Sequence, residues 1–315
     1  MKKRPVILDC DPGHDDAIAL MLALASEKLD VRLISVSAGN STLERTAKNA
    51  LKIVSFLEKN VEVAAGAEKP LCRTVIPDVE THGESGLDGP VLPEPELGLS
   101  SRRALEAQIA VLEKSELKVT IISTGPLTNT ALLLSARPDL KDRIERIVLM
   151  GGACFGGNWL PNAEFNIMID PEAADIVFSS GVPITMCGLD VTLKAQIYPA
   201  EFELFRSMQN KAGPLTAELL DFFHRSTTPP FMAEEGHEEG AHMHDVCAVA
   251  WVLAPQIFVS RLLNVQIETS SALTLGCTVV DYNNVFKLKP NADVCFDLAR
   301  EKFLELLINH IKTLP

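Results

Sequence analysis

The sequence predicts an α/β protein, a single domain with a mainly parallel, Rossmann-like central sheet flanked by helices. Short apolar runs typical of buried strands alternate with longer helical patterns through most of the 315 residues. Hydrophobic residues make up 47% of the chain, which is ample for a buried core. No linker rich in Gly, Ser or Pro divides the sequence, so we expect one domain over residues 1–315.

The chain begins with a strand, a turn and a helix. Residues 6–8 form a short apolar run that predicts the first strand. A polar turn follows, and residues 17–25 predict an apolar helix with acidic Asp15 and Asp16 in its first turn.

The next segment repeats this order. Residues 31–38 alternate well enough for a second strand, and Ser41 with Glu44 forms a capping-box pattern ahead of an amphipathic helix. The same rhythm predicts further strands at 61–65, 119–123, 147–150 and 184–187, and a helix over 102–113. Such alternation indicates parallel strands covered on both faces.

Two segments predict long loops, and long loops in compact domains are often binding loops. Residues 71–99 are rich in Pro and Gly, and residues 226–243 are rich in Pro, Glu, Gly and His. We expect active-site loops in both places. The last third of the chain predicts a helix over 246–253, strands at 265–268 and 277–280, and a closing amphipathic helix over 297–311.

Composition excludes some classes of partner. Lys and Arg number 29 against 42 Asp and Glu, a formal net charge of −13, so we expect no nucleic-acid partner bound through a broad basic surface. No apolar stretch is long enough to cross a bilayer, and no signal peptide is evident. The seven cysteines are scattered without a C-x-x-C pair, which is typical of reduced thiols and predicts a cytoplasmic protein without a membrane partner.

An acidic cluster follows the first predicted strand. Residues 9–16 read DCDPGHDD, which places four carboxylates within eight residues. Their repulsion is costly unless a cation or a proton offsets it, and open parallel sheets bind ligands beyond the carboxyl ends of their strands. Oxygen ligands suit Ca²⁺ or Mg²⁺, whereas zinc prefers more nitrogen and sulfur. The alternative is that these acids serve only the helix N-terminus and a turn.

A second polar cluster follows the strand predicted at 147–150. Gly151 and Gly152 come first, and a dense set of amides and one carboxylate comes next: Asn158, Asn162, Glu164 and Asn166. Such side chains can bind several hydroxyl groups at once, so a sugar is a natural ligand. A turn-rich loop whose Asn side chains bond to their own backbone is the alternative, and composition leaves both interpretations open.

Histidines form a third group. His244 and Asp245 lead into the predicted helix over 246–253, where Asp245 suits the N-terminus and a histidine could act as a proton donor near neutral pH. His82 is a loop histidine with no context of its own. A transition-metal site built from His237, His242 and His244 matches no closed zinc spacing, and a solvated loop is the remaining alternative.

Taken in order, these motifs resemble the inosine-uridine type nucleoside N-ribohydrolases over nearly the whole chain. Among bacterial members the resemblance is strongest to the broad-specificity type that accepts purine and pyrimidine ribosides. The matching segments are DCDPGHDDA at 9–17, HGESG at 82–86, TGPLTN at 124–129, MGG at 150–152, AEFN at 163–166, DPEAA at 170–174 and HD at 244–245.

The resemblance implies the nucleoside hydrolase fold and a calcium-dependent hydrolysis of the N-glycosidic bond of ribonucleosides, which yields free base and ribose. It implies that calcium is bound by the side chains of Asp11, Asp16 and Asp245 and by the backbone carbonyl of Thr124. The ribose would be held by Asp15, Asn40, Asn158, Glu164 and Asn166, with a backbone contact from Met150. Asp9 would support these ligand residues without contacting the ion itself.

The same resemblance implies three catalytic residues. Asp11 would accept a proton from a water that the calcium ion orients and activates. His244 would protonate the departing base, or would bind and polarise it together with His82. Some relatives carry tyrosines before this histidine, whereas the tyrosines of this chain, Tyr198 and Tyr282, lie elsewhere.

Several alternatives stay open from the sequence. Base preference is not fixed, so a pyrimidine-specific hydrolase of uridine and cytidine is one alternative, and a non-catalytic calcium-dependent nucleoside-binding protein is another. A phosphatase with an aspartate nucleophile would need cationic residues around the acids, and Pro12 and Gly13 stand where it would carry a threonine or valine. The resemblance also implies a homodimer or homotetramer, and nucleoside salvage is the associated role.

Overall fold

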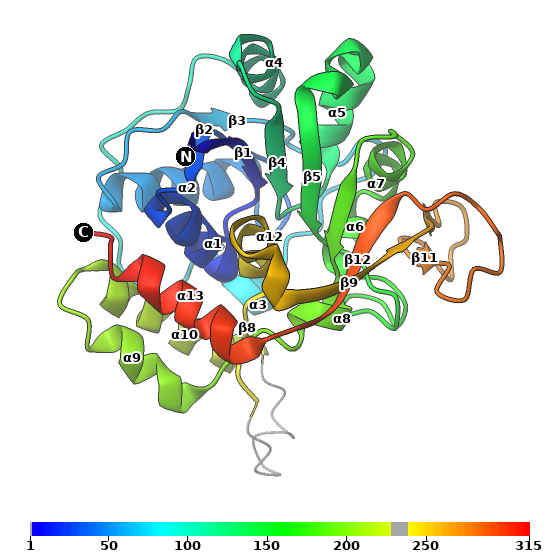
Figure 1. Ribbon diagram of the computed structural model, residues 1–315. Helices are drawn as coiled ribbons and strands as arrows, with labels where there is room; N and C mark the ends of the chain where they lie inside the picture. The colour runs from blue at the N-terminus through cyan, green and yellow to red at the C-terminus, as the bar shows by residue number, and fades with distance from the viewer. Residues whose placement is uncertain (1, 228–238) are drawn as a thin grey trace.

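The computed structural model describes residues 2–227 and 239–315 and contains a central sheet of eight strands (Figure 1). Seven strands run parallel, and the edge strand β9 is antiparallel to its neighbour β12. In spatial order the strands are β3 (Val63–Ala65), β2 (Leu29–Val36), β1 (Arg4–Cys10), β4 (Val119–Ser123), β5 (Ile144–Met150), β6 (Ile184–Cys187), β12 (Ala292–Leu298) and β9 (Phe258–Leu263). The predicted parallel sheet flanked by helices is confirmed.

Helices cover both faces of this sheet (Figure 1). One face packs against α1 (His14–Ala25), α2 (Leu43–Phe56), α12 (His244–Leu253) and α13 (Arg300–Ile311). The other packs against α4 (Ala104–Lys114), α5 (Thr128–Ala136) and α7 (Pro171–Phe178). Side chains of β1 alternate between the two cores, with Val6 and Leu8 in the first and Ile7 in the second. The strands are therefore buried on both sides, as parallel strands usually are.

Short elements complete the described chain. Two small ladders pair β7 (Gln196–Ile197) with β8 (Ala241–His242) and β10 (Val265–Ile267) with β11 (Thr278–Val280). The remaining α-helices are α3 (Val79–His82), α6 (Phe165–Ile169), α8 (Leu189–Thr192), α9 (Phe202–Arg206) and α10 (Ala212–Thr227). Short 3₁₀ helices span Pro138–Arg143, Pro199–Glu201 and Pro255–Ile257. None of the described helices is long and apolar enough to span a membrane.

The strand order places a topological switch point between β1 and β4. From β1 the chain moves outward through β2 to β3, and it then crosses back to β4 and moves the other way through β5 to β6. Loops at such a point diverge at the carboxyl ends of the strands and leave a crevice there. The loops after β1 and β4 carry Asp11 and Thr124.

Two local predictions were wrong. The closing helix begins at Arg300, because Asp297 belongs to β12, which pairs with β6 and β9. The capping box is also absent: the N-cap of α2 is Thr42, whose side chain makes no capping hydrogen bond, and the Ser41 hydroxyl has no hydrogen-bond partner within residues 2–227 and 239–315. Ser41 instead packs against Gly86.

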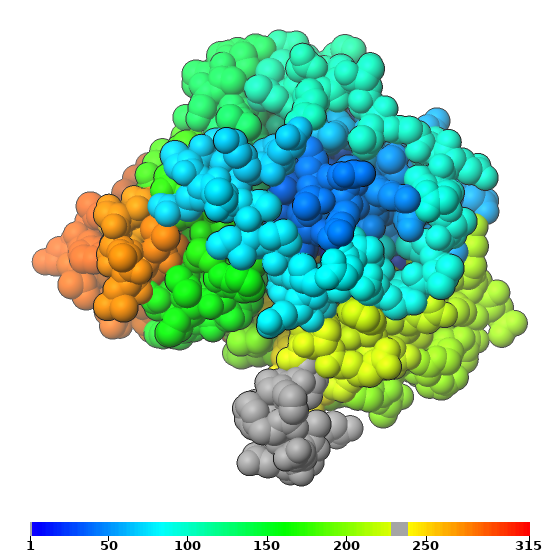
Figure 2. Space-filling view, turned by 180° about the vertical axis from the view of Figure 1, so that it is seen from behind, coloured from blue at the N-terminus to red at the C-terminus, as the bar shows by residue number. Residues whose placement is uncertain are grey.

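The two predicted loops contain regular structure at particular points. Within 71–99 the chain forms the one-turn helix α3, and Figure 2 shows the residues after β3 lying close to α10 on the face behind that of Figure 1. Within 226–243, residues 226–227 end α10 and Ala241–His242 form β8. Residues 228–238 of that predicted loop lie outside the described residues.

Candidate active site

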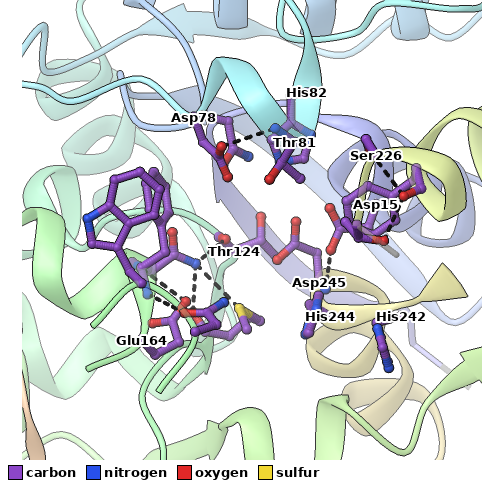
Figure 3. Close-up of a pocket in the computed structure, with 18 of the residues that line it drawn as sticks. Asp15, Asp78, Thr81, His82, Thr124, Glu164, Ser226, His242, His244 and Asp245 are labelled. Carbon is purple, nitrogen blue, oxygen red and sulfur yellow. Dashed lines mark hydrogen bonds between the residues drawn. The ribbon is translucent and has the colours of Figure 1, made fainter. Parts of the chain in front are cut away.

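A cavity of about 620 Å³ opens at the carboxyl ends of the parallel strands (Figure 3). The predicted ribose ligands all line it: Asp15, Asn40, Met150, Asn158, Glu164 and Asn166. Thr124, Asp245 and the two predicted catalytic histidines, His82 and His244, line it as well. No Lys or Arg does so among the described residues. A phosphate-transfer site would need such cations, so the cavity does not suit that chemistry.

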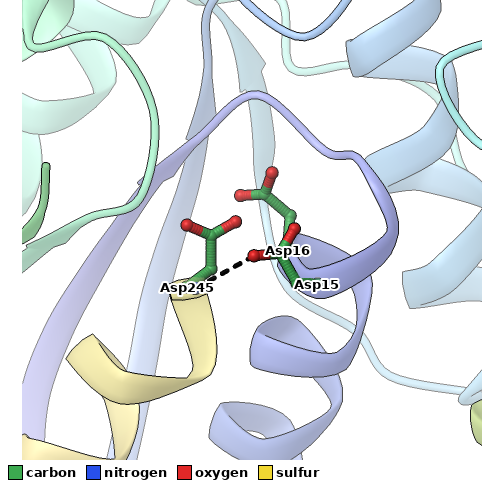
Figure 4. A group of neighbouring side chains, drawn as sticks. All are labelled: Asp15, Asp16 and Asp245. Atoms are coloured by element: carbon green, nitrogen blue, oxygen red, sulfur yellow. Dashed lines mark hydrogen bonds between the residues drawn. The ribbon is translucent and has the colours of Figure 1, made fainter. Parts of the chain in front are cut away.

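Three buried carboxylates gather where two helices begin (Figure 4). One oxygen from each of Asp15, Asp16 and Asp245 lies within 4.8 Å of the others. Asp15 and Asp16 stand in the first turn of α1 and Asp245 in the first turn of α12. The positive ends of the two helix dipoles favour negative charge at this point.

Asp16 is held by three polar neighbours. Its Oδ2 accepts hydrogen bonds from the backbone N–H of Gly13 at 3.1 Å and from the Asn40 amide at 3.1 Å. Its Oδ1 accepts a hydrogen bond from the Thr124 hydroxyl at 2.7 Å. The carboxylate is thus fixed between the loops that follow β1, β2 and β4.

Asp11 belongs neither to the three-carboxylate group nor to the cavity lining. Its side chain is fully buried. Its Oδ2 accepts a hydrogen bond from the Asn40 backbone N–H at 2.7 Å, and its Oδ1 is buried with no hydrogen-bond partner in the described part of the chain. The carboxylate fits because Gly39 and Gly125 have no side chain: a Cβ on either would come within 2.0 Å or 2.2 Å of an Asp11 oxygen.

Burial raises the pKa values of these acids, because no cationic side chain among the described residues offsets the loss of water. The pKa of Asp15 is raised to about 7, and desolvation raises those of Asp11 and Asp245 well above the usual range. The donor set consists of carboxylates, and the orphaned Oδ1 of Asp11 lacks a positive partner. These features fit a hard divalent cation such as Ca²⁺.

The opposite wall is built by Glu164 and Asn166 at the start of α6. Glu164 caps this helix and also accepts a hydrogen bond from the Gly152 N–H at 2.8 Å, and burial raises its pKa to about 7. The Asn166 amide donates to the backbone carbonyls of Thr124 at 2.8 Å and Met150 at 3.2 Å. The Thr124 carbonyl, a predicted calcium ligand, therefore already accepts one hydrogen bond.

Histidines and phenylalanines form the side of the cavity near α3 and α10. His82 lies against Gly13, where a Cβ would clash with the imidazole, and its Nδ1 is 3.1 Å from Nδ1 of His14. The His82 ring stacks on Phe223, which also lines the cavity. This side therefore offers a flat aromatic surface suited to a planar ligand.

His244 and His242 lie on the third side of the cavity. Nδ1 of His244 is 2.7 Å from the Thr192 hydroxyl, and burial lowers the pKa of His244 to about 3, so the imidazole is neutral at pH 7. Nε2 of His242 lies 3.4 Å from Glu239, and no metal-binding cluster of histidines occurs among the described residues. His237, named in that alternative, lies outside the described residues.

Sequence reasoning missed two of these contact residues. Thr192 follows β6, and polar residues beyond the carboxyl end of that strand could have been inspected as those beyond β1 were. Glu239 lines the cavity and has one buried oxygen without a hydrogen-bond partner among the described residues. Nothing in its local sequence distinguishes it from its neighbours at 234, 235 and 238, which are also glutamates.

Comparisons with known proteins agree with this architecture. The family model described as inosine-uridine preferring nucleoside hydrolase matches residues 6–305. A pyrimidine-specific ribonucleoside hydrolase RihA from Salmonella schwarzengrund is 50% identical over 312 residues, covering 98% of each chain.

Two solved structures have the same fold. A purine-preferring ribonucleoside hydrolase from Gardnerella vaginalis superposes with a TM-score of 0.90 at 31% identity, covering 98% of each chain. The plant nucleoside hydrolase PpNRh1 superposes with a TM-score of 0.89 at 26% identity, covering 99% of each chain.

Proposed function

This chain belongs to the inosine-uridine preferring nucleoside hydrolase family, and we propose that it is a calcium-dependent hydrolase of pyrimidine ribonucleosides that releases free base and ribose. The observation that carries the proposal is the buried group of Asp15, Asp16 and Asp245 at a cavity whose other wall offers Glu164 and Asn166. Carboxylates and amides in this number suit the hydroxyls of a ribose.

We infer that Asp16 and Asp245 would hold the calcium ion with Asp11 and the Thr124 carbonyl. Asp11 is included because its Oδ1 is buried and unpartnered, as expected of an oxygen whose partner is a cation. A calcium ion bound there would act as a Lewis acid that lowers the pKa of a water and helps to hold the sugar hydroxyls.

The ribose would be bound by residues that are already rigid. Glu164 accepts hydrogen bonds from three backbone N–H groups, those of Gly152, Asn166 and Ile167. Asn40 is fixed by its amide hydrogen bonds to Asp11 and Asp16. Side chains held in this way lose little entropy on binding, so they can fix the sugar in a reactive conformation.

Asp11 would accept the proton of the attacking water at Oδ2, because Oδ1 is assigned to the calcium ion. The Asn40 N–H donates one hydrogen bond to Oδ2, which leaves that oxygen a second lone pair. The pKa of Asp11 is raised in the absence of a cation, and a neighbouring positive charge lowers it again and keeps the carboxylate ionised to act as a base.

The departing base would lie near the aromatic side of the cavity. Phe223 and His82 offer a surface for a planar ring, and the neutral His244 can hydrogen-bond to the base. Cleavage leaves the electron pair of the glycosidic bond on the base, so a donor placed there stabilises the transition state more than the substrate.

The preference for pyrimidines is supported by the 50% identity to RihA, which is named as pyrimidine-specific. A reducing-sugar assay tests it, with kcat/KM measured side by side for uridine, cytidine, inosine and adenosine. We expect ribose release chiefly from uridine and cytidine. Equal ribose release from all four nucleosides would show that the enzyme is of the broad-specificity type. No release from any of them would refute the proposal.

We further propose a homodimer or homotetramer that works in the cytoplasm, with nucleoside salvage as its role. All seven cysteines are free, which suits a reducing compartment. Apolar side chains on the edge strand β9 are exposed, Val259 by 60% and Leu262 by 61%, and such a patch suits a contact between subunits. Analytical ultracentrifugation tests the assembly, and a monomer at micromolar concentration would refute it.

A further inference from the structure

One contact of His244 determines where its ring hydrogen resides. His244 is the first residue of α12, and its Nδ1 lies 2.7 Å from Oγ1 of Thr192. Thr192 is the last residue of α8, just after β6, and it is fully buried. Within residues 2–227 and 239–315, the contact with His244 is the only hydrogen bond that the Thr192 hydroxyl makes.

Counting hydrogens gives the direction of this bond. The Thr192 hydroxyl carries one hydrogen, and a buried donor without an acceptor costs about 1–3 kcal/mol. If Nδ1 of His244 carried a hydrogen, it would donate to Oγ1, and the hydroxyl hydrogen would have no described acceptor. Only one arrangement leaves neither group unsatisfied: Thr192 donates and Nδ1 accepts through its lone pair. The hydrogen of the neutral ring is then on Nε2.

Nε2 is open to the cavity. His244 lines the cavity, and no described residue makes a hydrogen bond to Nε2. The buried polar side-chain atoms that lack a partner in the described chain are Asp11 Oδ1, Ser41 Oγ, Gln108 Oε1 and Glu239 Oε2. Because Nε2 of His244 is not among these atoms, it is accessible from the cavity and available to a ligand.

We propose that Thr192 is a positioning residue: its hydroxyl fixes His244 in the Nε2–H tautomer, so that the imidazole presents a hydrogen-bond donor to the departing nucleobase. The proposal rests on the proposed function. With Thr192 removed, the ring can rotate or exchange tautomers and turn a lone pair towards the base, which repels the charge that develops there.

The reaction balances without a change in the charge of His244. The bond between C1′ and the base nitrogen breaks, and its electron pair stays on the base. The water oxygen bonds to C1′, one water proton passes to a carboxylate and then to solvent, and the base takes up one proton from solvent. Nε2–H stabilises the anionic base by a hydrogen bond before that proton arrives.

The test compares T192V, which has nearly the same shape without the hydroxyl, with T192S, which keeps it. Each is assayed on uridine and on a 4-nitrophenyl riboside, whose nitrophenolate leaves as a stable anion without a hydrogen bond. We expect T192V to lose about 10–100-fold in kcat on uridine and to stay within about 3-fold of wild type on the aryl riboside. T192S should match wild type on both substrates.

Nitrogen-15 NMR of histidine-labelled wild-type protein provides a readout that does not depend on the variants folding. The His244 signals are assigned by their loss in His244→Gln, and we expect a protonated Nε2 and an unprotonated Nδ1. A protonated Nδ1 would overturn the proposal, as would an equal loss on both substrates in folded T192V. If wild-type protein cleaves neither substrate, the proposed function has failed, while the NMR experiment still decides the tautomer.

Discussion

The backbone N–H of Asp245 donates a hydrogen bond to Oδ2 of Asp15 at 3.1 Å, joining the first turns of α1 and α12 across 230 positions of sequence. This bond places two carboxylates side by side and aims both helix N-termini at the same point. The helix dipoles lower the cost of gathering the charges, but they do not remove it, as the raised pKa values of Asp15 and Asp245 indicate. A bound cation would offset the repulsion between the carboxylates that the helix dipoles leave.

Asp16→Asn tests the cation site at its most constrained ligand. The substitution keeps the size of the side chain but removes a charge that Thr124, Gly13 and Asn40 hold in place. We expect calcium affinity, measured by titration calorimetry, to fall by more than about 100-fold. Loss of a residue that only hydrogen-bonds to a metal ligand typically costs about 10–100-fold. Asp142→Asn, at an exposed position, is the matched control. Unchanged affinity in D16N would remove Asp16 from the site.

Asp11→Asn separates proton transfer from substrate binding. The amide cannot accept a proton, so we expect kcat on uridine to fall by about 10²–10⁴-fold, the usual contribution of a general base. KM should change much less when calcium is saturating, because the ribose and the base are assigned to other residues that line the cavity. Steady-state kinetics at saturating calcium provide the measurement. If KM rises in the variant while kcat stays at the wild-type value, Asp11 binds the substrate and does not accept the proton.

Gly39→Ala tests the packing that holds Asp11. A Cβ at Gly39 would lie 2.0 Å from Oδ2 of Asp11, so the carboxylate must move. We expect activity to fall by at least about 100-fold and the free energy of unfolding to fall by about 1–3 kcal/mol, as in overpacked cores.

Gly98→Ala provides the control for that variant, because a Cβ at Gly98 meets nothing within 4 Å. Urea denaturation and uridine turnover of both variants decide the point. Wild-type turnover in G39A would mean that the position of Asp11 is unimportant.

Calcium affinity should depend on pH near neutrality. In the metal-free protein burial raises the pKa of Asp15, which stands beside Asp16 and Asp245, to about 7, and it raises the pKa of Asp245 well above its usual range. Protons therefore compete with the cation below about pH 7. These protons are released on binding, and affinity therefore rises with pH through this range. Asp15 alone predicts an about 10-fold loss of affinity from pH 8 to pH 6. Calorimetric titrations at the two pH values check this, and equal affinities would contradict it.

The strands that could be predicted show one of two local patterns. β1, β4 and β5 contain short apolar runs bounded by polar residues, whereas apolar and polar residues alternate in β2. The polar residues after β1, β4 and β5 line or support the cavity. β12 was missed although residues 294–296 form a short apolar run between Asp293 and Asp297. Its place in the sheet comes from pairing with β6 and β9, which the local sequence does not encode.

From the sequence, site residues could be predicted only where they lie near the end of a strand. Asn40 follows β2 directly enough for the rule for parallel sheets to point to it, and Glu164 belongs to the polar cluster after β5. The family resemblance alone assigned both residues to the ribose. The contact between Thr192 and His244 joins α8 to α12, and no local pattern encodes it. The grouping of Asp15 instead of Asp11 with Asp16 and Asp245 likewise depends on side-chain directions that spacing alone does not reveal.

The most direct test of the account is ribose release from uridine by protein stripped of metal and verified as metal-free by elemental analysis. We predict no turnover in the stripped protein and full recovery when calcium is restored. In the proposed mechanism, the ion held by the carboxylates of Asp16 and Asp245 activates the water and binds the sugar hydroxyls. Undiminished ribose release from verified metal-free protein would contradict the central claim that this acidic group works as a cation site.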